Sequence, residues 1–139
     1  MANDLNGHSY VTNDANAIIN PDLHDAEIVA IELVNDVHIR FKLVSDELVS
    51  VRLIDVKQIC FDNLRQGNIV LDVTVSTNEK LTAKDKQKLF GEIQYGNSRL
   101  SFYIDALDEN LQCGNLKLIR INPSYGCNMV AICQNLVFE

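Results

Sequence analysis

The chain has 139 residues, 47% of them hydrophobic, and its 12 Lys and Arg against 19 Asp and Glu give a formal net charge of −7. This length fits one domain with its own core, and the acidic balance argues against nucleic acid or anionic lipid as a partner. No segment approaches the roughly 18 apolar residues of a membrane span, and the first 20 residues lack the pattern of a signal peptide. We therefore expect a cytoplasmic protein that does not bind a membrane.

The first 22 residues are rich in Asn, and their only substantial apolar pair is Ile18-Ile19. Such a composition is typical of a chain terminus that is not tied down. We expect a flexible N-terminal arm over residues 1–22, with at most one helical turn, and a single β-rich domain over residues 23–139.

Alternating apolar and polar residues over 37–43 and 49–53 predict two strands, each with one buried face. A three-residue loop, Ser45-Asp46-Glu47, keeps both apolar sets on that face and pairs Leu43 with Val49. It also pairs Phe41 with Val51.

A strand over Ala26–Leu33 precedes these two, and we expect the turn Val34-Asn35-Asp36 to join it to the second. The register that we favour places Glu32 opposite His38 on the polar face. The competing register would bury the Glu32 carboxylate beside Ile39, which is costly.

Further elements follow from the same patterns. Thr82 can cap a helix with Asp85 at its third position, and Gly96 is a natural end for it. Residues 56–64 also suit a helical stripe, but their short length favours a strand end followed by a loop. Further strands are expected at Ile69–Val75, Leu100–Asp105, Leu116–Ile121 and Met129–Phe138. The third of these is either buried on both faces or bulged, and the fourth reads as a central strand covered on both sides. The fold class is α+β, mostly β: an antiparallel sheet or two-sheet sandwich of about seven strands with one packed helix.

Catalytic and cofactor signatures are absent from the sequence. There is no C-x-x-C spacing, no phosphate-binding glycine loop and no nucleophile elbow. His8, His24 and His38 lie too far apart in the expected fold to share a metal, and Cys113 is expected to be inert. We expect no cofactor, no metal and no enzymatic activity.

Acidic residues gather at three places and are the candidates for binding a partner. One group is expected in a loop, a second around another loop, and the last residue on a polar strand face: Asp105, Asp108 and Glu109; Asp55 and Asp62; and Asp72. Such residues often do no more than keep a protein soluble. They would also speed association with a basic protein.

Three short segments carry a resemblance: Leu23-His24-Asp25-Ala26, the run from Gly67 to Asp72, and Pro123-Ser124-Tyr125-Gly126. Their order resembles that in a group of small uncharacterised bacterial β-rich proteins, several of which are similar to immunity proteins of polymorphic or contact-dependent toxin systems. The resemblance implies a cytoplasmic protein that neutralises a toxin, often a nuclease, by binding it. It carries over no catalytic residues, and the chain departs from it at Ser45-Asp46-Glu47, where a glycine is common.

Three functions follow as alternatives. The first is a non-enzymatic, immunity-type protein whose acidic surface covers a basic toxin. The second is a small ligand-binding protein or enzyme that uses His24, Asp25 and Tyr125 in a pocket. The third is a structural subunit whose strand edges pair in a homodimer, so that both a monomer and a homodimer are open.

Overall fold

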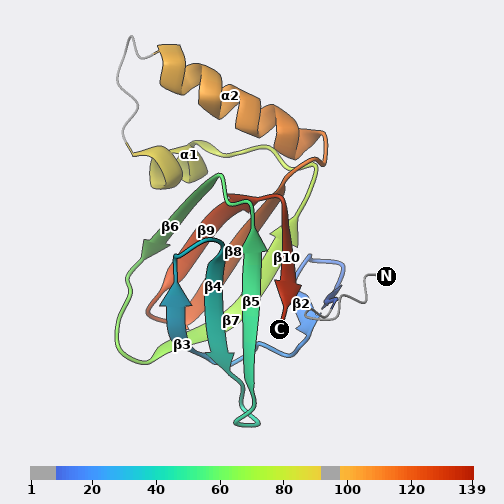
Figure 1. Ribbon diagram of the computed structural model, residues 1–139, viewed down its shortest axis with the longest axis vertical. Helices are drawn as coiled ribbons and strands as arrows, with labels where there is room; N and C mark the ends of the chain where they lie inside the picture. Colours follow the sequence, from blue (N-terminus) through green and yellow to red (C-terminus); the bar gives the residue numbers. More distant parts are fainter. Residues whose placement is uncertain (1–8, 92–97) are drawn as a thin grey trace.

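The computed structural model describes residues 9–91 and 98–139 and confirms a mostly β, α+β fold. In this part of the chain the elements are β1 (Val11–Thr12), β2 (Ile18–Asn20), β3 (Glu27–Glu32), β4 (Val37–Lys42), β5 (Leu48–Ile54), β6 (Gln58–Asp62), β7 (Asn68–Ser76), α1 (Ala83–Phe90), α2 (Ser98–Gln112), β8 (Lys117–Tyr125), β9 (Asn128–Cys133) and β10 (Asn135–Phe138). Both helices lie at one end of the strands (Figure 1).

A single antiparallel sheet contains eight of the described strands, in the order β10-β5-β4-β3-β7-β8-β9-β6. The chain runs directly from β5 into β6 and from β9 into β10. Because β5 pairs with β10 and β6 pairs with β9, the two ends of this order are joined. Backbone hydrogen bonds continue the pairing around the corner, from Lys57 N–H to the Ile132 carbonyl (2.7 Å) and from Gln134 N–H to the Ile54 carbonyl (3.0 Å). The sheet therefore closes on itself into two packed layers (Figure 1).

The core has two parts that lie on opposite faces of β8 and β9. Met129, Ala131 and Cys133 point into the space between the layers. Val130 and Ile132 point the other way and pack with Leu81, Leu89, Leu107 and Leu111 from the helical region. The stretch Met129–Phe138 is not the single central strand that was expected, because it divides at Gln134 into β9 and β10. The expected burial of both faces is confirmed for β9, whose successive side chains alternate between the two parts of the core.

The first hairpin has the expected register, with Glu32 opposite His38. The second was wrong by two residues: Phe41 pairs with Val49, and the Leu43 N–H bonds to the Glu47 carbonyl (2.8 Å). The loop is thus Val44-Ser45-Asp46, with Asp46 in the left-handed conformation that three-residue loops favour (φ 73°). A shift of two residues preserves the faces, so the buried residues were predicted correctly.

The expected strand at Leu100–Asp105 is wrong, because these residues belong to helix α2. The alternation of Leu100, Phe102 and Ile104 is too short to distinguish period 2 from period 3.6. Ile104, Leu107 and Leu111 are the buried positions, and their spacing is helical. The acidic residues 105, 108 and 109 therefore lie on this helix rather than in a loop.

Helix α1 has the expected start. The Thr82 hydroxyl accepts from the Asp85 N–H (3.0 Å), and the Asp85 carboxylate accepts from the Thr82 N–H (3.1 Å). The helix ends at Phe90 with Gly91 as its cap. The expected end at Gly96 lies outside the described residues.

The described part of the expected arm, from Ser9 onward, contains strands β1 and β2 rather than a helical turn. Ile18 is buried in the core, and Ala17 forms a bridge with Thr74 of β7. Within residues 9–91 and 98–139, no helix has both the length and the apolar character to cross a membrane.

Candidate functional site

Helix α2 presents an aromatic and acidic stripe to solvent. Phe102, Asp105, Ala106 and Glu109 are all exposed, and their spacing of three, four and seven residues places them on one helix face. Phe102 is 80% exposed. No ion pair involves Asp105 or Glu109 within the described residues. We call these four residues the α2 stripe.

The opposite face of α2 is fixed to the fold. Ile104, Leu107 and Leu111 are buried, and the Asp108 carboxylate accepts a hydrogen bond from the Leu81 N–H (2.8 Å). The Tyr103 hydroxyl donates to the Lys57 carbonyl (3.2 Å), and its ring meets Phe90 edge to face. These contacts attach one face of α2 to the fold, so the α2 stripe is presented on the opposite, exposed face.

The other candidate acids do not join the α2 stripe. Asp108 is buried and structural. Asp55 pairs with Lys57 (2.9 Å) and Asp62 with Lys88 (3.9 Å). Asp72 accepts from the side-chain amide of Asn122 (2.6 Å). Of the six acids predicted to bind a partner, only Asp105 and Glu109 are both exposed and free of such contacts.

His24 and Asp25 do meet, although neighbours on an extended strand would point apart. Asp25 adopts a left-handed conformation (φ 61°), which brings its carboxylate to 3.6 Å from His24 Nε2. The Leu71 carbonyl lies 3.0 Å from Nδ1. This carbonyl first, and then the Asp25 carboxylate, raise the pKa of His24 above its ordinary value.

Tyr125 is exposed at the end of β8, where it pairs with Ile69. The two cavities described below are lined by other residues, so neither unites Tyr125 with His24 and Asp25. With contacts at both ring nitrogens, His24 is arranged as a surface anchor between the β2–β3 connection and β7.

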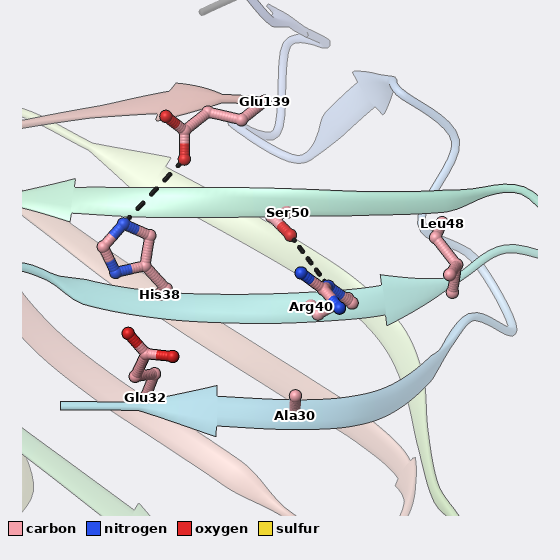
Figure 2. A pocket seen from close by; sticks show the side chains of 7 residues that line it. All are labelled: Ala30, Glu32, His38, Arg40, Leu48, Ser50 and Glu139. Atoms are coloured by element: carbon pink, nitrogen blue, oxygen red, sulfur yellow. Dashed lines mark hydrogen bonds and ion pairs between the residues drawn. The ribbon is translucent and has the colours of Figure 1, made fainter. Parts of the chain in front are cut away.

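A groove of about 650 Å³ crosses the outer face of β3, β4 and β5 (Figure 2). Cross-strand neighbours form its floor, with Glu32 opposite His38 and Ala30 opposite Arg40. Arg40 Nε donates to the Ser50 hydroxyl (3.3 Å). Within the described residues, neither Arg40 nor Glu32 makes an ion pair, so the groove holds one free cation and one free anion.

Glu139 closes one side of the groove. Its backbone exchanges two hydrogen bonds with Ser50, and its carboxylate lies 3.9 Å from His38 Nε2 and 3.6 Å from Arg52 Nε. Serine, histidine and glutamate are the residue types of an acyl-transfer triad. Here, however, Ser50 accepts from Arg40, and His38 directs Nε2 towards Glu139, so the serine and the imidazole are not joined (Figure 2).

No protein-family model matches the chain, and no curated protein or solved structure matches it either. The resemblance to immunity proteins therefore stays an expectation.

A second cavity, of about 340 Å³, lies between α1 and strands β8 and β9. Arg120 lines it and is already held by Asp85 (2.8 Å) and Glu79 (3.1 Å). Lys88 is hydrogen-bonded to Asn128. Lys84 also lines the cavity and is exposed, with no ion pair among the described residues, so the cavity has two cations in structural contacts and a third that is not.

The cysteines offer neither a reactive buried thiol nor, among the described residues, part of a metal site. Burial raises the pKa of Cys133 to about 12 and also raises that of Cys127, so both thiols are poor nucleophiles. Cys113 is exposed. In the part of the chain that the structure describes, no group of three or more His, Cys, Asp or Glu side chains is placed to hold a metal ion.

Sequence reasoning missed Phe102 and the groove. In the strand expected at Leu100–Asp105, Phe102 would lie on the same face as Leu100 and Ile104. Only the helical spacing of Ile104, Leu107 and Leu111 indicates that it faces outward. The Glu32–His38 pairing was predicted, but the free Arg40 beside it carries no sequence signal.

Proposed function

We propose that this protein is a non-enzymatic binding protein of immunity type that neutralises a basic toxin, and that the α2 stripe is its docking surface. The observation that carries the proposal is Phe102, an 80% exposed aromatic ring on a helix whose opposite face is buried. Two exposed carboxylates, Asp105 and Glu109, follow it on the same face and make no ion pair among the described residues. Aromatic residues dominate the binding energy of many protein interfaces.

Charge supports the same partner class. The whole chain carries −7, which attracts a basic protein over a distance and raises the rate of encounter. Asp105 and Glu109 lie three and seven residues after Phe102, so a Lys or Arg of the partner can reach either carboxylate while an apolar pocket takes the ring.

The experiment is calorimetry between this protein and the product of the gene immediately upstream of its own, at two salt concentrations. We expect tight binding that weakens as salt rises, because exposed charges are screened. Phe102→Ala should weaken binding at least about tenfold, which corresponds to about 1.4 kcal/mol.

A matched control removes two acidic residues, Asp46 and Glu47, from the β4–β5 region instead of from α2. Asp105→Asn with Glu109→Gln should weaken binding, whereas Asp46→Asn with Glu47→Gln, which removes the same charge from the β4–β5 loop, should not. Equal losses from both double variants would show that net charge alone acts. Absence of binding, or binding that Phe102→Ala leaves unchanged, would refute the proposed surface.

A further inference from the structure

Strand β3 has an open edge. It pairs with β4 from Glu27 to Glu32, with a β-bulge between Ile28 and Ala30, but with β7 only at Glu27 and Ile28. Beyond that point β7 diverges, and the backbone groups of Val29 to Glu32 that face away from β4 have no partner strand among the described residues. An unpaired edge is a template for another strand.

The side chains along this edge are more exposed than a sheet interior requires. Val29 is 44% exposed and Leu33, directly after the strand, is 61% exposed. Ile31, between them, pairs with buried Ile39 and is itself only partly buried. Ile31 packs against the core, Val29 occupies a β-bulge between Ile28 and Ala30, and Leu33 follows the strand. Nothing in the described chain covers these three residues fully.

The edge is complementary to itself. If two copies pair antiparallel about a two-fold axis at Ile31, Val29 of one copy lies opposite Leu33 of the other, and the two Ile31 residues meet. Each apolar residue then has an apolar neighbour, which is the pairing that stabilises a sheet. A contact of this kind uses the same patch twice and closes as a dimer.

The outer face gains opposite charges in the same arrangement. Glu32 of one copy lies opposite Ala30 of the other, and the next strand beyond Ala30 carries Arg40. Two strand spacings, about 9.6 Å, separate the backbones of Glu32 and Arg40. Extended Glu and Arg side chains can span this distance across the small Ala30. The free anion and the free cation of the groove therefore become two equivalent ion pairs.

We propose that the protein forms a two-fold symmetric homodimer through the open edge of β3, with Glu32 of each copy paired to Arg40 of the other. The two grooves then join into one across the new, continuous sheet. Arg40 exchanges its 3.3 Å hydrogen bond to Ser50 for a carboxylate. The dimer does not depend on the α2 stripe, which lies at the helical end of the strands (Figure 1).

Sedimentation velocity over a concentration series tests this on the full chain. We expect the wild type to be dimeric. Glu32→Arg and Arg40→Glu should each shift it to monomer, because like charges then face each other, and the double variant with both changes should restore the dimer. Glu47→Arg, the same reversal at an exposed position in the β4–β5 loop, should leave the dimer intact.

Circular dichroism shows whether each variant is folded, and hydrogen exchange supplies a readout that needs no variant. The amides of residues 29–33 should exchange more slowly as the wild-type concentration rises. A wild type that stays monomeric at every attainable concentration would overturn the proposal. So would a dimer that both single reversals leave unchanged, since it must use another surface.

Discussion

Three polar contacts converge on Asp85: two with Thr82 and one with Arg120. It is 6% exposed, completes the capping box of α1 with Thr82, and pairs with Arg120 at 2.8 Å. Burial by itself would raise the pKa of this carboxyl. The hydrogen bonds from the Thr82 backbone and the Arg120 guanidinium outweigh it and lower the pKa below its ordinary value of 3.8.

Replacing Asp85 with Asn should therefore cost stability in a pH-dependent way. A carboxyl with a lowered folded pKa stabilises the fold above its unfolded pKa of about 3.9, and this contribution disappears as the pH falls through the folded value. We expect Asp85→Asn to lower the free energy of unfolding by about 2 kcal/mol at neutral pH, and by less in acid.

Urea denaturation from neutral pH to pH 2 measures this difference. Asp105→Asn is the control. That carboxylate is exposed and makes no ion pair with any residue that the structure describes, so its loss should change stability little at any pH. A loss from Asp85→Asn that is the same at neutral pH and in acid would mean that the charge of Asp85 is not what stabilises the helix start.

At the scale of elements, the β8–β9 turn depends on a close approach of backbone to side chain. Gly126 has a φ of 85°, and a Cβ added there would collide with the side-chain oxygen of Asn68. That oxygen is already in use, because it accepts from the N–H groups of Arg65 (2.8 Å) and Cys127 (3.0 Å). The buried Asn68 thus ties the start of β7 to this turn.

Gly126→Ala should therefore lower the free energy of unfolding by more than the backbone strain of the left-handed conformation alone. Gly67 provides a matched comparison, with a φ of 77° and no atom within 4 Å of the added Cβ. We expect about 1 kcal/mol for Gly67→Ala from the left-handed conformation and about 3 kcal/mol for Gly126→Ala, where the collision adds to it. Thermal denaturation compares the two variants, and equal losses would contradict the role of Asn68.

Strands β4 and β5 could be predicted because their apolar and polar residues alternate strictly. Helix α2 could not, because its first residues alternate in the same way over only a few positions. The buried faces of β4 and β5 were predicted correctly, although the loop was placed one residue too late along the chain. This error shifts the cross-strand partners by two residues, and a shift of two leaves every side chain on the same face of the sheet. The prediction for α2 was wrong because the spacing of Leu100, Phe102 and Ile104 fits a strand as well as a helix. The capping box at Thr82 and Asp85 succeeded because it is a local signal that packing does not override.

At the scale of the whole molecule, the fold depends on closure of the sheet. Leu136 of β10 is 2% exposed and pairs with fully buried Leu53 of β5. This contact joins the last strand to the central hairpin, and no local pattern in the sequence could have indicated it. Closure was for this reason beyond sequence analysis, although the apolar character of residues 129–138 was evident.

Leu136→Ala should destabilise the entire fold rather than only the attachment of β10. We expect a loss of about 3 kcal/mol in the free energy of unfolding, in one cooperative transition. Leu48→Ala, at a position that is 57% exposed, removes the same atoms and should cost far less. Urea denaturation followed by circular dichroism and by tyrosine fluorescence checks this. Transitions that fail to coincide would show that β10 detaches on its own.

The pairing of Leu53 with Leu136 also has a consequence for how fast the molecule forms. The two residues are 136 − 53 = 83 positions apart in the chain, and such distant contacts slow folding to milliseconds or seconds in comparable β-proteins. During synthesis β5 can pair with β4 at once, but its other edge stays uncovered until residues 135–138 leave the ribosome. The nascent chain therefore passes through an interval in which β5, which has a neighbour on each side in the final sheet, is an exposed edge. In that interval the chain is most open to misassembly and to capture by chaperones.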